Sequence, residues 1–193
     1  WCIMTSPLNH ESTVAFFEQH HHFGLDPSTV HFFTQGVMPS VDCETGEVLL
    51  AAPDAIAFNP DGHGGTLRAL ATSGLLTALR GRGIEHLSYF QVDNPLVRAL
   101  DPVFLGLHID GSVSSAEVTS KAVAKRSPEE KVGVFGVQNG ELTVLEYSDL
   151  DPGICEATDG DGKLRFRAGN MAVHAFGLDF LDRLTNGTGL PFH

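Results

Sequence analysis

Short apolar runs and helix-spaced apolar positions alternate along this chain, and the alternation predicts strands and helices in turn. Continuous apolar runs indicate buried strands, whereas apolar residues three and four positions apart indicate the buried side of a helix. The predicted strands are Trp1–Thr5, Val30–Gln35, His86–Val92 and Glu117–Ala122. The predicted helices are Glu11–His21, Thr66–Arg80, Leu96–Leu100, Val103–Ile109 and Leu178–Leu184.

Two segments have the pattern of antiparallel hairpins. Val41–Ala57 is expected to turn at Glu44-Thr45-Gly46, and Val132–Gln138 is expected to pair with Glu141–Tyr147 through Asn139-Gly140. Asn-Gly is the strongest short hairpin signal, because both residues tolerate positive φ. Strands that alternate with helices predict an α/β fold: a mostly parallel twisted sheet with helices on both faces, to which these hairpins add an antiparallel part.

A glycine-rich loop leads into the predicted helix Thr66–Arg80. Its sequence, Asn59-Pro60-Asp61-Gly62-His63-Gly64-Gly65, gives a flexible turn at a helix start, where backbone N–H groups can approach a ligand closely. A tight loop that merely begins a helix explains the same glycines. The segment matches neither G-x-G-x-x-G nor a Walker A loop, since no Gly-Lys-Ser/Thr follows.

Composition favours a soluble globular domain and excludes some partners. The chain has 193 residues, 42% hydrophobic and 19% charged, and contains no apolar run near the ~20 residues of a membrane span. A net charge of −12 argues against nucleic acid, although Mg²⁺ and backbone N–H groups could still hold the phosphates of a nucleotide. Three separated cysteines without a C-x-x-C motif point to a reducing compartment, so we expect a cytoplasmic protein.

Three polar residues follow apolar runs and are candidates for a ligand site. Gln35, Asp93 and Asn170 are expected to converge on one cleft beyond the carboxyl ends of the strands. The Asp93 carboxylate could bind Mg²⁺ or could only cap the next helix. The Gln35 amide could pair with a uracil edge or satisfy a buried backbone group. Asn170 could bind a sugar or bridge two loops.

Other candidates also have a purely structural alternative. Gly62 could bring its backbone against a base or serve turn geometry alone. Glu146 could accept hydrogen bonds from sugar hydroxyls or lie on a solvated edge. The run His20-His21-His22 is expected to be structural or solvated, because three adjacent helical residues point in different directions and cannot all bind one metal.

Several short motifs follow one another in a characteristic order along the chain. They are, in sequence, Met4-Thr5-Ser6, Phe32-Phe33-Thr34-Gln35-Gly36, the loop Asn59–Gly65, Val92-Asp93-Asn94, Val132-Gly133-Val134, Glu146-Tyr147-Ser148 and Ala168-Gly169-Asn170. Together they resemble the UDP-sugar pyrophosphorylase family over residues 1–185, with most similarity to its UDP-N-acetylhexosamine pyrophosphorylase branch.

The resemblance implies a Rossmann-like nucleotidyltransferase core and a UTP-dependent sugar-1-phosphate uridylyltransferase. The substrates would be UTP and a hexose or N-acetylhexosamine 1-phosphate, with Mg²⁺ as cofactor. By the same resemblance, the uracil contacts are Gln35 and Gly62, the catalytic and metal-binding residue is Asp93, and the sugar contacts are His63, Gly133, Glu146 and Asn170.

Two departures from the family pattern leave the sugar open. His63 stands where the N-acetylhexosamine branch usually has Asn, and Arg167 replaces a usual Asn before Ala168. A UDP-glucose or broad UDP-sugar pyrophosphorylase, a non-catalytic nucleotide-sugar binding module and a metal-dependent hydrolase built on the histidines remain the alternatives.

Residues 1–193 are expected to be the central part of a single catalytic domain. The family's N-terminal Gly-rich loop would precede Trp1, and its Lys-containing C-terminal segment would follow His193, since Leu190-Pro191-Phe192-His193 resembles the start of that segment. The 193-residue piece alone is therefore expected to be inactive.

Overall fold

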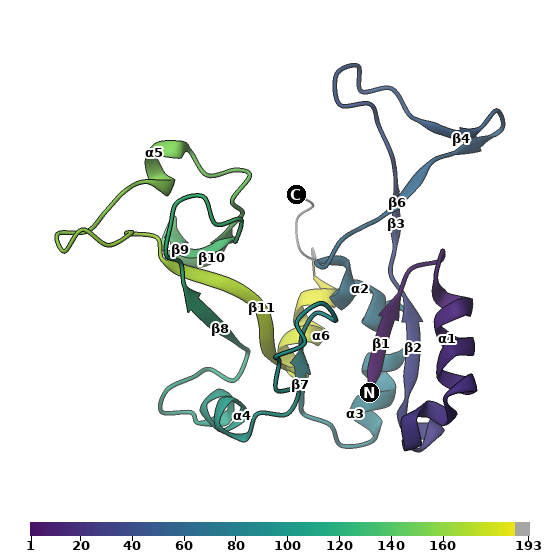
Figure 1. Cartoon of the computed structure of the whole chain (residues 1–193). Coiled ribbons are helices and arrows are strands. Elements are labelled where there is room, and N and C mark those ends of the chain that lie inside the picture. The colour runs from purple at the N-terminus through teal and green to yellow at the C-terminus, as the bar shows by residue number, and fades with distance from the viewer. Residues whose placement is uncertain (188–193) are drawn as a thin grey trace. The chain divides into compact units, whose positions relative to one another are not determined.

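The computed structural model describes residues 1–187 and divides into two compact units. Unit 1 comprises Trp1–Ile84 and the chain from Leu181 onward, and unit 2 comprises Glu85–Phe180. Both units combine helices with strands, which confirms the α/β class (Figure 1). The segment Leu190–His193, expected to begin a family element, lies outside the described residues.

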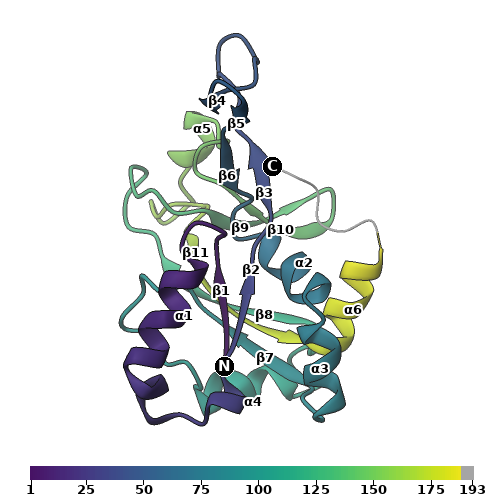
Figure 2. The ribbon, with the colours of Figure 1, turned by 90° about the vertical axis from the view of Figure 1, so that its right-hand side faces the viewer.

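Unit 1 begins with a strand–helix–strand crossover. β1 (Cys2–Thr5) and β2 (His31–Thr34) pair in parallel, from Cys2 opposite His31 to Thr5 opposite Thr34. α1 (His10–Gln19) and two short 3₁₀ turns, η1 (His21–Gly24) and η2 (Pro27–Thr29), connect them. In both ribbon views β1 and β2 lie between α1 on one side and α2 and α3 on the other (Figures 1 and 2).

α1 ends two residues earlier than predicted. After Gln19, the histidine run leaves the helix: His22 and Phe23 have φ of 49° and 54°, in the left-handed region. The Phe23 ring stacks on His20 at 5.5 Å and meets Phe17 edge-on at 5.1 Å. The aromatic contacts therefore offset the cost of the positive φ values and turn the chain toward β2.

Two antiparallel ladders form an extension that projects from the rest of unit 1 (Figures 1 and 2). β3 (Val37–Pro39) pairs with β6 (Phe58–Pro60), and β4 (Leu50–Ala52) pairs with β5 (Ala55–Ile56). The predicted turn at residues 44–46 is confirmed by a bridge between Val41 and Val48. A second turn at Pro53-Asp54, which the sequence pattern did not reveal, divides the predicted hairpin in two.

The helix predicted over Thr66–Arg80 is two helices. α2 (Gly65–Thr72) ends at Ser73, and α3 (Leu75–Gly81) begins after Gly74. Gly74 has φ of +79°, which only glycine adopts at little cost, and its N–H donates to the Ala71 carbonyl at 3.0 Å. The glycine expected in a helix interior is therefore a helix terminator. An ion pair at 2.5 Å joins Arg80 of α3 to Asp182 of α6 (Leu178–Asn186).

The five strands of unit 2 form one antiparallel sheet. Its order is β10-β9-β11-β7, with β8 paired to β11 as well. The members are β7 (His86–Tyr89), β8 (Val118–Ala124), β9 (Val134–Gln138), β10 (Glu141–Leu145) and β11 (Ala168–Gly177). The predicted Asn139-Gly140 hairpin joins β9 to β10, with φ of 54° and 88° at the two turn residues.

β11 is the longest strand of the described residues, and the sequence pattern did not predict it. Its buried residues are small or β-branched, among them Gly169, Val173, Ala175 and Gly177, so no strong apolar run marks it. Helices α4 (Pro102–Ile109) and α5 (Pro152–Cys155) complete unit 2. The helix expected at Leu96–Leu100 is a series of turns instead.

Parallel pairing within residues 1–187 is limited to β1 and β2. The expected mostly parallel sheet is therefore not confirmed. The paired strands of unit 2 all run antiparallel to one another. None of the helices in residues 1–187 has the length and apolarity needed to cross a bilayer.

Each unit has its own apolar core. In unit 1, α1 contributes Phe17, β2 contributes Phe33, and α2 and α3 contribute Leu70 and Leu76, all under a tenth exposed. In unit 2, Phe104, Val173 and Ala175 form a cluster against which Phe90, Val97 and Leu105 pack. The Lys121 ammonium lies 4.9 Å from the centre of the Phe104 ring and bonds the Asp101 carboxylate at 2.7 Å, which fixes α4 on β8.

Candidate functional site

A cavity of about 290 Å³ in unit 1 contains one of the predicted nucleotide contacts. Gln35 follows β2, and its backbone N–H donates to the Thr5 carbonyl at 2.8 Å, which extends the pairing of β2 with β1. Its half-buried side chain faces the cavity. The residues that line the cavity are Thr34, Gln35, Gly36, Val37, Met38, Asp61, Arg68, Ala69 and Thr72.

The Gln35 amide has a partner across the cavity. Its Nε2 donates to Oδ1 of Asp61 at 3.5 Å, and the Asp61 N–H donates to the Gly36 carbonyl at 3.1 Å. The loop after β2 is thus joined to the glycine-rich loop before α2. The sequence motifs indicated Gln35 but neither Asp61 nor Arg68 as a site residue, although Asp61 belongs to the glycine-rich loop and Arg68 to the helix that follows it.

Gly62 and His63 form the turn that begins α2. Gly62 has φ of +78°, and its carbonyl accepts from Gly65 N–H at 3.3 Å, while the His63 carbonyl accepts from Thr66 N–H at 3.1 Å. The structural role expected of the glycine turn is therefore present. Both residues are exposed, and their contacts with base and sugar stay predictions.

Unit 2 brings three predicted sugar contacts together. The Asn170 N–H of β11 donates to the Gly133 carbonyl at 2.7 Å. A Cβ placed on Gly133 would lie 3.2 Å from each carboxylate oxygen of Glu146, so Glu146 covers the Gly133 backbone. Residues from three separate sequence motifs thus lie side by side where β9, β10 and β11 meet.

The side chain of Asn170 is held by its own strand. Oδ1 accepts from the Ala172 N–H at 3.0 Å, and Ala172 has φ of 51° where the pairing of β11 with β8 shifts register. The carbonyl end of the amide is therefore fixed by the backbone. Within residues 1–187 its Nδ2 group has no hydrogen-bond partner, so this end of the amide is a donor suited to a hydroxyl group.

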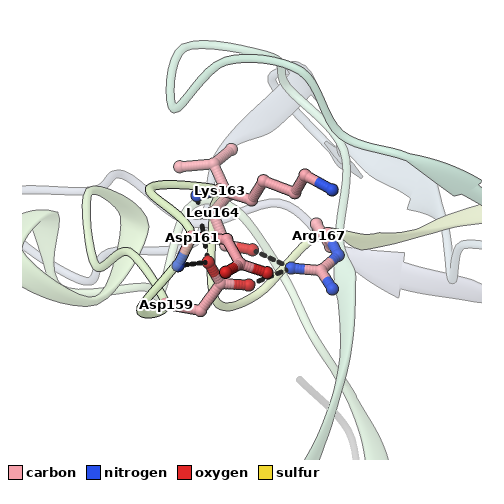
Figure 3. Close-up of polar contacts among 5 residues, drawn as sticks. All are labelled: Asp159, Asp161, Lys163, Leu164 and Arg167. Carbon is pink, nitrogen blue, oxygen red and sulfur yellow. Dashed lines mark hydrogen bonds and ion pairs between the residues drawn. The ribbon is translucent and has the colours of Figure 1, made fainter.

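Arg167 anchors the loop that precedes β11 (Figure 3). Its Nη1 donates to Oδ2 of Asp159 at 2.5 Å and to the Leu164 carbonyl at 3.2 Å, while Oδ1 of Asp159 accepts from the N–H groups of Asp161 and Lys163. The hydrogen bond from Arg167, together with these N–H groups, lowers the pKa of the Asp159 carboxyl below its ordinary value. Arg167, which departs from the family pattern, stabilises the approach to Asn170.

Asp93 lies beyond the end of β7 in an exposed turn. The strand ends at Tyr89 rather than at Val92 as predicted. Oδ1 of Asn94 accepts from the Leu96 N–H at 3.2 Å, and Asp101 caps α4 through the N–H groups of Val103 and Phe104. Asn94 therefore closes a turn and Asp101 caps the next helix, α4, so the interpretation of Asp93 as a helix cap is wrong. Its role as a metal ligand stays a prediction.

Two separate groups of histidine and hydroxyl side chains lie in unit 2, around His108 and around His174, and no sequence motif indicated them. Nε2 of the fully buried His108 lies 3.2 Å from Nδ1 of His86, and Nδ1 of His108 lies 2.9 Å from the Thr119 hydroxyl. Nδ1 of His174 lies 2.7 Å from the Ser120 hydroxyl. Burial lowers the pKa of His108 and of His174, with the His86 charge a further cause for His108.

Metal binding by the histidine run has no support in the structure. Among the described residues no three His, Cys, Asp or Glu side chains are grouped so that they could hold a metal ion. His20 and His22 contact aromatic rings instead, Phe23 and Phe17 respectively.

Comparison with known proteins identifies the family. Residues 1–191 match the family described as UTP–glucose-1-phosphate uridylyltransferase. The chain belongs to that family. It is 44% identical over 190 residues to UDP-N-acetylglucosamine diphosphorylase 2 of Arabidopsis thaliana and 38% identical over 195 residues to UDP-N-acetylglucosamine pyrophosphorylase of Saccharomyces cerevisiae.

Solved structures of this uridylyltransferase family share the fold. A putative UDP-N-acetylglucosamine pyrophosphorylase of Entamoeba histolytica superposes with a TM-score of 0.86 at 31% identity, over 100% of this chain and 47% of that one. UDP-N-acetylglucosamine pyrophosphorylase of Trypanosoma brucei superposes with a TM-score of 0.83 at 32% identity, over 96% of this chain and 36% of that one.

The chain spans only part of its relatives. The match covers 97% of this chain but 37% of the Arabidopsis protein, and 100% of this chain but 40% of the yeast protein. Gln35 belongs to unit 1, whereas Asp93 and Asn170 belong to unit 2, so their convergence on one cleft stays a prediction.

Proposed function

We propose that this chain is part of a UTP-dependent sugar-1-phosphate uridylyltransferase that forms UDP-N-acetylglucosamine and pyrophosphate. The observation that carries the proposal is the juxtaposition of Gly133, Glu146 and Asn170, three residues from separate family motifs: a 2.7 Å bond joins Asn170 to Gly133, and the Glu146 carboxylate lies against the Gly133 backbone. The family match over residues 1–191 and the names of the relatives at 38% and 44% identity support the reaction class.

The reaction needs no covalent enzyme intermediate. A phosphate oxygen of the sugar 1-phosphate attacks the α-phosphorus of UTP, and pyrophosphate leaves as the bond to the β-phosphate breaks. Catalysis of such a displacement is in-line positioning together with stabilisation of charge on the phosphate oxygens. The contribution of this chain would be to bind and orient the base and the sugar.

Each unit supplies groups suited to one part of the product. In unit 1, Gln35 lines the cavity with an amide that can pair with a uracil edge, and Gly62 exposes its backbone in the neighbouring turn. In unit 2, Asn170 offers amide N–H donors and Glu146 a carboxylate acceptor, the complementary pair that sugar hydroxyls require. His63 would lie beside the sugar at the start of α2.

Asp93 is the residue that would hold Mg²⁺. Its carboxylate is exposed and has no hydrogen bond or ion pair within residues 1–187, which fits a hard oxygen ligand that shares the metal with substrate phosphates. The bound metal would neutralise charge on those phosphates. One carboxylate suffices for this, because Mg²⁺ commonly keeps waters and takes substrate phosphates as its other ligands.

The wider fold and the location are also proposals. A mostly parallel, Rossmann-like sheet in the whole domain is supported by the parallel pair β1–β2 with its α1 crossover and by the TM-score of 0.86 to a longer family structure. A cytoplasmic location is supported by three cysteines that form no disulfide within the described residues.

Activity on another hexose 1-phosphate is a second candidate. His63 replaces the Asn usual in the N-acetylhexosamine branch, which favours a UDP-glucose or broad UDP-sugar pyrophosphorylase. A non-catalytic nucleotide-sugar binding module would use the same Gln35 cavity and the same Asn170 cluster without turnover.

Pyrophosphate release by the intact protein separates these candidates. It is measured with UTP and Mg²⁺ against N-acetylglucosamine 1-phosphate, N-acetylgalactosamine 1-phosphate and glucose 1-phosphate, with EDTA as control. Fastest turnover of N-acetylglucosamine 1-phosphate supports the proposal, and fastest turnover of glucose 1-phosphate supports the second candidate. Binding of UDP-N-acetylglucosamine by calorimetry without turnover of any sugar would indicate a binding module.

A further inference from the structure

We propose that Asp61 is a positioning residue that fixes the side-chain amide of Gln35 in the orientation that selects uracil over cytosine. The inference rests on the proposed function, since it concerns the base of the nucleotide substrate. It adds a residue that acts through Gln35 and need not touch the nucleotide itself.

The contact that carries the inference lies in the unit 1 cavity. Nε2 of Gln35 donates to Oδ1 of Asp61 at 3.5 Å, and both side chains line the same 290 Å³ space. An amide has one acceptor end and one donor end, whereas an ionised carboxylate can only accept. Asp61 therefore holds the donor end of Gln35, and the acceptor Oε1 remains for a ligand.

This orientation distinguishes the two pyrimidines. Uracil carries a hydrogen on N3 and donates there, whereas cytosine N3 has a lone pair and accepts. Oε1 of Gln35 can pair with N3–H of uracil but faces a second acceptor in cytosine. If the amide could rotate by half a turn, its NH₂ end would pair with cytosine, and the preference would fall. A site that leaves a buried polar group unpaired rejects the wrong ligand strongly.

The Asp61 carboxylate packs closely against the backbone of two glycines. A Cβ on Gly36 or on Gly65 would collide with this carboxylate, so two glycines flank it where any side chain would displace it. The Asp61 N–H donates to the Gly36 carbonyl at 3.1 Å, which fixes the start of the side chain as well. A Cβ on Gly64, between His63 and Gly65, would meet nothing within 4 Å, so Gly64 provides a matched comparison.

The test is the ratio of kcat/KM for UTP to that for CTP in the intact protein. Asp61→Asn keeps the shape of the side chain but lets it donate as well as accept, so Gln35 can take either orientation. We expect the ratio to fall by roughly 10-fold, mainly through KM, with kcat for UTP near that of the unchanged protein. The ratio cancels the effect of removing a charge near the phosphates, because both nucleotides carry the same triphosphate.

A double-mutant cycle tests whether Asp61 acts through Gln35. Gln35→Ala alone should lower the same ratio, and adding Asp61→Asn should then change it by less than about 2-fold, because the group that Asp61 orients is gone. Equal effects of Asp61→Asn with and without Gln35 would overturn the inference. An unchanged ratio in the single Asp61→Asn variant would overturn it too.

Two glycine variants and a binding measurement keep the test decisive. Gly65→Ala should displace the carboxylate and lower the ratio as Asp61→Asn does, whereas Gly64→Ala should leave the ratio unchanged. If the wild-type protein has no turnover, the proposed function is contradicted, and the inference about Asp61 must be tested by binding instead. Calorimetric affinities for UDP and CDP then replace kcat/KM, and an affinity ratio insensitive to Asp61→Asn overturns the inference separately.

Discussion

The N–H of Asn170 donates to the carbonyl oxygen of Gly133 at 2.7 Å, and this bond joins β11 to the residue that precedes β9. The two residues lie in different family motifs, and the Glu146 carboxylate covers the same stretch of backbone. A disturbance at Gly133 should therefore reach Glu146 and Asn170, the two side chains of unit 2 that are expected to contact the sugar.

Replacing Gly133 by Ala should impair sugar binding more than nucleotide binding. The new Cβ would lie 3.1 Å from Cγ1 of Val144 and 3.2 Å from both Glu146 oxygens, so the carboxylate must move by a few tenths of an ångström. We expect KM for the sugar 1-phosphate to rise by roughly 10-fold, about 1.4 kcal/mol, and KM for UTP to change little.

Gly136→Ala is the matched control for this variant. Gly136 lies in β9 of the same hairpin, and its Cβ would meet apolar atoms of Leu145 and Phe166 rather than a carboxylate. Steady-state kinetics of both variants, together with their melting temperatures, separate the site effect from general loss of stability. Equal changes in both KM values for Gly133→Ala would exclude a specific sugar role.

Asp93→Asn should abolish most Mg²⁺-dependent turnover and leave stability unchanged. The carboxylate is exposed and has no partner within residues 1–187, so the fold loses no contact. Loss of a metal-bound carboxylate should lower the rate on the order of 10³-fold or more. Asp54→Asn, at an exposed aspartate in the β4–β5 turn, controls for removal of one negative charge. Activity close to normal in Asp93→Asn would refute the metal role.

The sequence correctly predicted the elements that are determined by residues close together in the chain. The Asn139-Gly140 hairpin, helix α4 and helix α6 were placed well, because a turn dipeptide and a regular apolar spacing depend only on neighbours in the chain. The break between α2 and α3 was missed because Gly74 fits a helical spacing, although its φ of +79° ends the helix.

The site was predicted less completely because its support comes from residues distant in sequence. Gly133, Glu146 and Asn170 could be named from motifs, but strand β11, which brings Asn170 to Gly133, has no strong apolar pattern. Asp61 was not identified because its role depends on the approach of Gln35 and Gly36 from the distant loop after β2. Strand alternation predicted parallel pairing, whereas the register in unit 2 is set by cross-strand contacts that the sequence does not reveal.

Acidification should destabilise unit 2 through the buried His108 and the partly buried His174. Burial lowers the pKa of His108 and His174 in the folded state, while the unfolded chain titrates near the ordinary value of about 6.5. The unfolded state therefore binds more protons as the pH falls through that value. The stabilisation is fully present above it and is lost as the pH falls toward the folded-state pKa.

Chemical denaturation of the intact protein at about pH 8 and about pH 5.5 measures this effect. The free energy of unfolding should be lower at the acidic pH, and His108→Gln should reduce the difference between the two conditions. His21→Gln, at an exposed histidine of η1, should not. Hydrogen exchange of the β8 and β11 amides locates the change. An unaltered pH dependence in His108→Gln would show that this network does not control acid stability.

His63 should influence which sugar the enzyme prefers. It lies in the exposed turn between Gly62 and the first residue of α2, where the family places a polar residue near the sugar. The backbone of this turn is held by the bonds from Gly65 N–H to the Gly62 carbonyl and from Thr66 N–H to the His63 carbonyl. Replacing His63 with Asn keeps a polar group but exchanges the imidazole ring for a smaller amide beside the sugar C2 substituent. We expect His63→Asn to shift the kcat/KM ratio of N-acetylglucosamine 1-phosphate to glucose 1-phosphate by roughly 10-fold, about 1.4 kcal/mol, toward the N-acetylated sugar.

Competition between the two sugar phosphates at fixed UTP measures the ratio directly, with His21→Asn as the control for loss of a histidine elsewhere in unit 1. A shift below about 2-fold would place His63 outside the sugar pocket.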